Sequence, residues 1–160
     1  AQPVGCFFQP RPVESTLVDA SIHDKNGAVL EGEVAALPEP NGPLHRRRIS
    51  LDLDARSLTI EDEITRIGQN SRYVEIDFVF HPDCDTKIKK GKKTRLAAHN
   101  GGRRLEITAD PLCLVSLHRG EHEPRRGWFS RSFMQAEPCW QACLSALIQK
   151  ETKFVTVIRW

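Results

Sequence analysis

The chain has 160 residues, of which 28% are charged and 39% hydrophobic, and its formal net charge is +2. This length suits one domain, and the composition is that of a globular protein rather than a disordered one. No apolar run reaches the length that spans a bilayer and no signal peptide is visible, so we expect no membrane association. Because the first residue is Ala1 and not Met, we also expect the chain to be processed or to be a piece of a longer protein.

The first 16 residues contain three prolines and no hydrophobic period, which predicts an irregular lead-in. We expect one β-sandwich domain over residues 17–160. Its first two short strands are predicted over residues 17–22 and 29–36. They flank the dipeptide Asn26-Gly27, which is a strong hairpin signal because both residues tolerate positive φ.

The clearest strand signals come next, where apolar and polar residues alternate with the period of a half-buried strand. This pattern covers residues 49–53, 58–64 and 74–80. The short polar turn Asp54-Ala55-Arg56 predicts that the first two of these strands pair as an antiparallel hairpin. We expect the third to continue them as a meander, whose apolar face needs a second layer to cover it.

The second half of the chain predicts more short strands. A hairpin is expected around residues 99–102, a strand over 112–117 and a polar loop over 120–127. The final strands are predicted over 140–148 and 154–160. The segment 140–148 also fits helical spacing, but Pro138 precedes it and strands surround it, which favours a strand. The predicted fold is therefore all-β, an antiparallel β-sandwich of about ten strands.

Positive charge is clustered although the net charge is small. Such clusters can attract a polyanion. Solvated strand ends and edge lysines that discourage aggregation give the same pattern, so the clusters alone do not prove a ligand. The clusters are residues 45–48, 87–95, 103–104 and 125–126.

The cysteines and histidines do not form a recognisable metal or disulfide pattern. The five cysteines include no CxxC pair, and we expect Cys113, Cys139 and Cys143 to be buried thiols. The six histidines are scattered, so the sequence predicts no metal site and no cofactor. One carboxylate, Asp62, is expected to point inward from its strand and to pair with an arginine.

Several segments occur together in a distinctive order. They are the run from His45 to Arg48, the hairpin from Asp54 to Asp62, the strand from Phe78 to Pro82, and the segment from Gly127 to Pro138, with Thr156 and Ile158 in the last strand. In this order and spacing they resemble the C-terminal β-domain of the heparinase II/III-like polysaccharide lyases over residues 17–160. Two positions depart from the family pattern, because Ala55 and Met134 stand where the family has glycine.

The resemblance implies a lyase that cleaves acidic, uronate-containing polysaccharides by β-elimination, and a periplasmic or secreted location. That reaction removes a proton next to a carboxylate, so it needs the carboxylate neutralised and a base and an acid beside it. In the family an N-terminal α/α-toroid domain supplies most of these groups, and this chain lacks that domain. We therefore predict no catalytic residue here, and whether the chain belongs to an active enzyme stays open.

The resemblance implies a supporting role, in which the domain packs against the toroid and lines the substrate cleft. Arginines would bind carboxylates or sulfates, and a tryptophan would stack on a sugar face, although burial in the core also fits that ring. An alternative is a free-standing module that binds a polyanion, either glycan or nucleic acid. Nucleic acid is the weaker version because aromatic residues do not interleave with the basic clusters. The predicted contact residues are His45, Arg46, Arg48, Arg125, Arg126 and Trp128.

Overall fold

The computed structural model describes residues 15–23, 26–35, 42–91, 93–132 and 135–160. The chain folds into two compact units, the first made of Ala1–Arg72 and Leu147–Val155, the second of Tyr73–Ala146 and Thr156–Trp160. In the described ranges every regular element is a β-strand, so the prediction of an all-β fold is confirmed. No helix among these residues is long and apolar enough to cross a membrane. Most of the expected lead-in, residues 1–14, lies outside the described residues, as does Met134.

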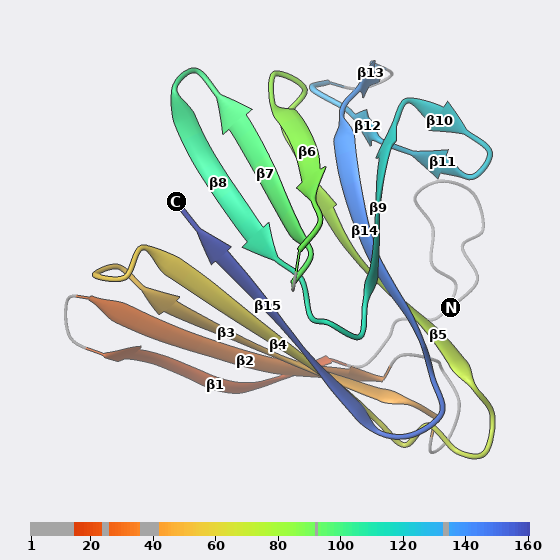
Figure 1. Ribbon diagram of the computed structural model, residues 1–160. Helices are drawn as coiled ribbons and strands as arrows, with labels where there is room; N and C mark the ends of the chain where they lie inside the picture. Colours follow the sequence, from red (N-terminus) through yellow and green to blue (C-terminus); the bar gives the residue numbers. More distant parts are fainter. Residues whose placement is uncertain (1–14, 24–25, 36–41, 92, 133–134) are drawn as a thin grey trace. The chain divides into compact units, whose positions relative to one another are not determined.

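The first unit is an antiparallel sheet in which the first four strands of the chain lie side by side in chain order, and the last strand of the chain pairs with the fourth (Figure 1). The hydrogen-bonded order is β1-β2-β3-β4-β15, and both predicted hairpins are present, with His23 opposite Gly27 and Asp52 opposite Ser57. The turn between β3 and β4 puts its positive φ on Arg56, which explains why Ala55 is tolerated there. The strands are β1 (Ser15–His23), β2 (Gly27–Ala35), β3 (Leu44–Asp52), β4 (Ser57–Thr65) and the first residues of β15 (Thr152–Arg159).

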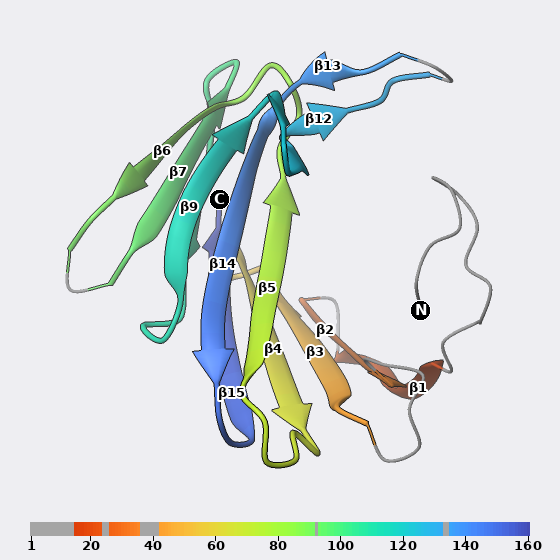
Figure 2. The same ribbon diagram turned by 90° about the vertical axis from the view of Figure 1, so that its right-hand side faces the viewer.

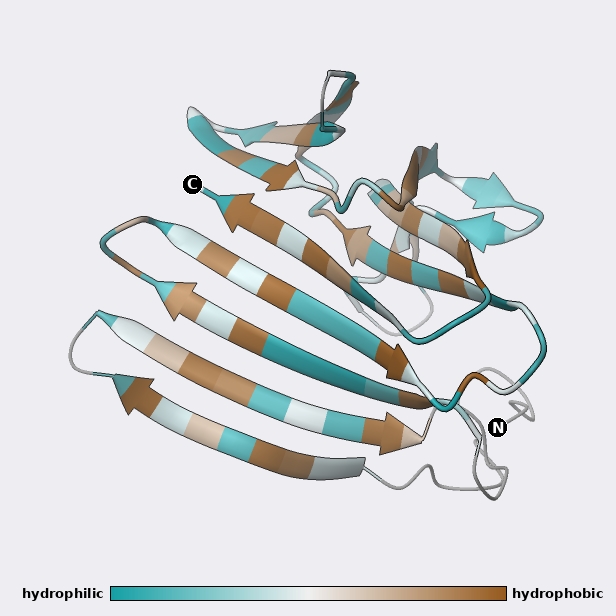
Figure 3. Ribbon diagram, turned by 60° about the horizontal axis from the view of Figure 1, so that its bottom comes forward, coloured by the Kyte–Doolittle hydropathy of each residue, from teal (hydrophilic) through white to brown (hydrophobic). Residues whose placement is uncertain are grey.

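Burial in this unit increases from β1 towards β4. Ile60, Asp62 and Ile64 alternate with more exposed residues along β4 and are buried, and Phe154 of β15 is buried with them. Strand β1 stays exposed along almost its whole length. Figure 3 shows the alternation of hydrophobic and hydrophilic residues along these strands, interrupted in β3 by the hydrophilic run from His45 to Arg48.

The second unit contains two antiparallel sheets, which form its two layers (Figures 1 and 2). One has the order β15-β8-β7-β6 and the other β5-β14-β9. The core of this unit contains buried residues from both sheets: Leu96 and Ile107 from the sheet with β7 and β8, and Ile76 and Leu144 from the sheet with β5 and β14. The strands are β5 (Arg72–Val79), β6 (Asp85–Lys89), β7 (Arg95–Asn100), β8 (Arg103–Thr108), β9 (Leu114–Arg119) and β14 (Trp140–Ile148).

Short paired segments connect β9 to β14. Strands β10 (Glu121–His122) and β11 (Arg125–Arg126) pair with each other, and β12 (Trp128–Phe129) pairs with β13 (Glu137–Pro138). The sequence predicted a polar loop over residues 120–127, but the structure pairs part of it as two short strands. Gly120 donates a hydrogen bond to the carbonyl of Gly127 at 2.9 Å, so the segment closes on itself as a hairpin, which we call the β10–β11 arm.

Other local predictions are confirmed. Residues 140–148 form a strand and not a helix, and the β7–β8 hairpin turns at Gly101 and Gly102, both with positive φ. The three cysteines expected to be buried are buried.

The predicted meander is wrong, because β5 does not pair with β4. Its partner is β14, whereas the partner of β4 is β15. Arg66 and Gly68 both have positive φ in the connection after β4, which turns the chain away from the line of a tight hairpin. Strand β5 has one buried face like a meander strand, so its alternation does not reveal which sheet it joins.

Candidate functional site

The six predicted contact residues lie in three places. His45 lies on one face of the sheet in the first unit, and Arg46 and Arg48 lie on its opposite face, since successive residues of a strand alternate. Arg125, Arg126 and Trp128 belong to the second unit, at the β10–β11 arm and the start of β12.

In the first unit His45 and Arg47 both bind Asp62, whose side chain is 1% exposed. His45 Nε2 and Arg47 Nε each lie 2.6 Å from Asp62 Oδ1, and Arg47 Nη2 donates to Oδ2 at 3.1 Å. Burial by itself raises the pKa of Asp62, but the hydrogen bonds from His45 and Arg47 outweigh it and hold the pKa below its usual value. The expected inward pairing of Asp62 with an arginine is confirmed.

An open apolar groove of about 340 Å³ lies beside this cluster. Leu17, Leu30 and Ile49 line it, and His45 and Arg47 are also among its lining residues. Because both side chains are already hydrogen-bonded to the buried carboxylate of Asp62, the groove offers a mainly apolar surface.

On the other face of β3 the arginines are paired with glutamates of β2. Arg46 Nη2 lies 3.2 Å from Glu33 Oε2, and Arg48 Nη1 lies 3.0 Å from Glu31 Oε2. Glu31 also lies 3.6 Å from Arg46 Nε. The positive charge of Arg46 and Arg48 is thus balanced in place by their cross-strand neighbours.

At the β10–β11 arm the guanidinium of Arg125 lies over the ring of Trp128, 5.8 Å from its centroid. The ring of His122 lies 5.2 Å from the same indole, tilted by 55°. Trp128 Nε1 donates to the carbonyl of Glu121 at 2.8 Å, which fixes the indole against the arm. Arg125 is exposed, and the ion pairs among the described residues do not include it. We call Arg125, His122 and Trp128 the aromatic platform.

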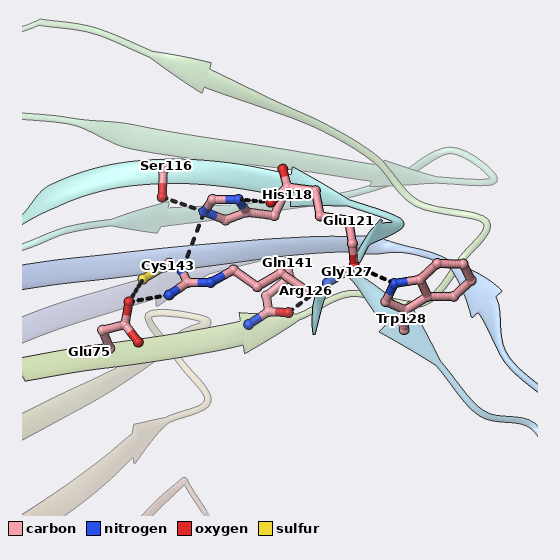
Figure 4. A network of polar contacts seen from close by, with 9 residues as sticks. All are labelled: Glu75, Ser116, His118, Glu121, Arg126, Gly127, Trp128, Gln141 and Cys143. Carbon is pink, nitrogen blue, oxygen red and sulfur yellow. Dashed lines mark hydrogen bonds and ion pairs between the residues drawn. The ribbon is translucent and has the colours of Figure 1, made fainter. Parts of the chain in front are cut away.

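Arg126, next in the chain, points instead into a polar network on the β5-β14-β9 sheet (Figure 4). Its Nη2 donates to Glu75 Oε1 at 2.5 Å, and Glu75 also accepts from the Cys143 thiol at 3.3 Å. These contacts lower the pKa of Glu75, the hydrogen bond from Arg126 being the main cause, and they raise the pKa of Arg126. Burial raises the pKa of Cys143 to about 11, so this thiol stays protonated at neutral pH. The guanidinium of Arg126 is therefore held on the sheet by its ion pair with Glu75.

The imidazole of His118 links the same sheet to the arm. Its Nδ1 lies 2.8 Å from Glu121 Oε2, and its Nε2 lies 2.7 Å from Ser116 Oγ and 3.4 Å from Arg126 Nη1. Since arginine only donates, Nε2 is the acceptor in the contact with Arg126, and Nδ1 is the nitrogen that faces the carboxylate of Glu121. A serine, a histidine and a carboxylate in this order can activate a nucleophile, but here the arginine also occupies the nitrogen that would act as the base. The arrangement positions the arm.

Glycine is required where the arm rejoins the sheet. Gly127 has a φ of 70°, and a Cβ there would lie 2.6 Å from Arg119 Cα and 2.7 Å from the carbonyl oxygen of Cys139. Its amide donates to Gln141 Oε1 at 2.7 Å. The backbone is thus locked at the point from which Trp128 departs.

At the β10–β11 arm these contacts present a cation beside an aromatic ring. The aromatic platform offers an uncompensated cation beside a flat ring, held by buried or paired groups behind it. No group of three or more His, Cys, Asp or Glu residues that could hold a metal occurs in the part of the chain that the structure describes. Sequence reasoning found Arg125 and Trp128 but missed His122, because the pairing of β10 with β11 that brings it to the indole has no signal in the sequence.

The fold is an antiparallel all-β domain, and its aromatic platform presents a cation beside an aromatic ring. The family model for the heparinase II/III-like C-terminal domain matches residues 4–160, and the chain belongs to this family. The predicted resemblance is confirmed. No curated protein matched the chain.

Solved structures share the fold at low sequence identity. The crystal structure of heparan sulfate lyase HepC from Pedobacter heparinus matches with a TM-score of 0.72 and 15% identity. A heparinase III gene product, BT4657, matches with a TM-score of 0.65 and 15% identity, and another heparinase III structure with 0.65 and 11%. Each alignment covers 91% of this chain and 21% of the other, so the chain spans about a fifth of the length of these proteins.

Proposed function

We propose that the chain is the substrate-holding β-domain of a polysaccharide lyase that acts on acidic polysaccharides, and that it does not itself supply the acid and base. Membership of the heparinase II/III-like family supports the class of enzyme. The exposed guanidinium of Arg125 over Trp128, without a carboxylate partner among the described residues, is the observation that carries the role.

The physical basis is the match between this surface and a charged sugar. An arginine binds a carboxylate or sulfate with two parallel hydrogen bonds, and an indole offers an apolar face to the C–H groups of a sugar ring. The alternative contacts at Arg46 and Arg48 would have to displace Glu31 and Glu33 before they could bind an anion. Arg125 has no such competitor in the described residues.

The catalytic groups of β-elimination would come from the rest of a longer protein, in the family's terms an α/α-toroid domain. This chain covers only 21% of the length of the similar lyase structure, which supports its being part of a larger protein. The first unit supports this too, where Leu17, Ile22 and Leu30 are exposed apolar side chains on strands β1 and β2 that another part of the protein would cover.

Substitution of Arg125 tests the role directly. We expect Arg125→Gln to weaken binding of a heparan sulfate oligosaccharide about fivefold to tenfold, the effect of losing one or two surface charge contacts. Arg125→Lys should recover only part of the affinity, because an ammonium keeps the charge but not the planar fork. Lys150→Gln is the matched control, since it removes one exposed cation from a turn in the first unit. Equal affinity for Arg125→Gln and the unchanged protein would remove the platform from the proposal.

The size of the native product separates the two readings of the chain. An antibody against this domain should detect a polypeptide several times larger than 18.1 kDa if the domain belongs to a lyase. A native product of 18.1 kDa would contradict this and favour a free-standing module that binds polyanions.

A further inference from the structure

In the second unit, the sheet β15-β8-β7-β6 carries many cations on the face that points away from its core. Residues directly opposite one another in an antiparallel sheet share a face. One row across the sheet runs Lys87, Ala97, Glu106 and Arg159, and the next places Lys89 opposite Arg95. The core residues Leu96 and Ile107 belong to the opposite face. The exposed cations, which we call the basic face, are Lys87, Lys89, Arg95, Arg104 and Arg159.

The carboxylates on this face are too few to balance it. Asp85 lies 3.2 Å from Lys87, and Glu106 lies 3.4 Å from Arg95 and 3.2 Å from Arg104. Two carboxylates therefore face five cations, and the exposed Lys90 and Lys93 of the β6–β7 connection add two more. On β3 of the first unit, by contrast, Arg46 and Arg48 lie close to two glutamates, Glu33 and Glu31.

Protein stability does not explain this arrangement. Lys89 and Arg95 lie directly opposite each other, and like charges in that position destabilise a sheet. Edge lysines can prevent sheets from pairing with one another, but that reason applies only to β6, which ends the sheet. Arg95 lies on β7, where it has Lys89 of β6 opposite it on one side and Thr108 of β8 on the other.

We propose that the basic face is a second binding surface for an acidic polysaccharide, on a different sheet from the aromatic platform. The class of ligand rests on the proposed function. Residues two apart on a strand are about 7 Å apart and neighbouring strands about 5 Å, so the cations form a flat grid. A grid suits an extended polymer that carries an anionic group on successive sugars, rather than a single small anion.

Reversal of one charge tests the surface without harming the fold. Lys89→Glu places a carboxylate opposite Arg95, so we expect its unfolding midpoint to equal or exceed that of the unchanged protein. Its binding to immobilised heparan sulfate should fall about tenfold at low salt, and the slope of log affinity against log salt should become shallower. Lys150→Glu makes the same change of charge in a turn of the first unit and should bind as the unchanged protein does.

The outcomes separate this surface from the aromatic platform. Unchanged binding by Lys89→Glu would overturn the basic face, whatever Arg125→Gln does. A loss with Lys89→Glu while Arg125→Gln binds normally would support the basic face and remove the platform. A DNA duplex bound more tightly than heparan sulfate at the same salt would overturn the assignment to a polysaccharide.

Discussion

Removal of the buried carboxylate of Asp62 should destabilise the first unit. Asp62→Asn keeps the size of the side chain but leaves His45 and Arg47 without their anion. A hydrogen bond to a charged group contributes about 1.5–3 kcal/mol, and breaking a fully buried ion pair costs about 3–5 kcal/mol. Arg47 and His45 are partly exposed and can regain water, so we expect a loss of about 2–3 kcal/mol at pH 7.

The loss should depend on pH with a definite sign. The pKa of Asp62 is lower in the folded chain than its usual value, so its contribution is complete above the usual value, near pH 4, and disappears as the pH falls through the folded pKa. The unchanged protein and Asp62→Asn should therefore differ fully at pH 7 and converge in strong acid. Urea unfolding at a series of pH values measures the difference.

Circular dichroism is the suitable signal, because the three tryptophans lie at positions 128, 140 and 160, all in the second unit. Tryptophan fluorescence should show the loss only if both units unfold together. Asp54→Asn is the control, since Asp54 is exposed and should change stability by less than about 0.5 kcal/mol. A loss of the same size at every pH would refute the charge-based reasoning, and a loss no larger than that of the control would refute the importance of the cluster.

Two further predictions concern the second unit. Gly127→Ala should lower the free energy of unfolding by about 3 kcal/mol, because the new Cβ clashes with backbone atoms and the residue also keeps a strained left-handed φ. Gly102 also has a positive φ but has open space around it, so Gly102→Ala should lower the free energy of unfolding by only about 1 kcal/mol, the cost of the strain. Equal losses in tryptophan-monitored unfolding would contradict the close approach at Gly127. The Cys143 thiol, with its pKa raised to about 11 by burial, should react with iodoacetamide at pH 7.5 only after the unit unfolds. Rapid labelling of the folded protein, read by peptide mass, would show that the thiol is accessible.

Local sequence determined most of the strands and hairpins. The alternation along β4, the Asn26-Gly27 signal and the Gly101-Gly102 turn each act between residues close in the chain, and the structure contains the corresponding elements. The inward direction of Asp62 followed from the same period, because a one-residue step on a strand changes the face. Family membership also followed from the order of motifs along the chain.

The tertiary structure decided which strands are neighbours and which charges are free. Nothing local states that β4 pairs with β15 or that β5 pairs with β14, since a half-buried strand carries the same alternation in either sheet. Arg48 and Arg125 look alike in the sequence, yet a cross-strand glutamate neutralises Arg48, whereas Arg125 stacks on an indole without an ion pair among the described residues. The sequence gives the number of charged residues. How much of that charge a ligand meets depends on which residues strand pairing places opposite each cation.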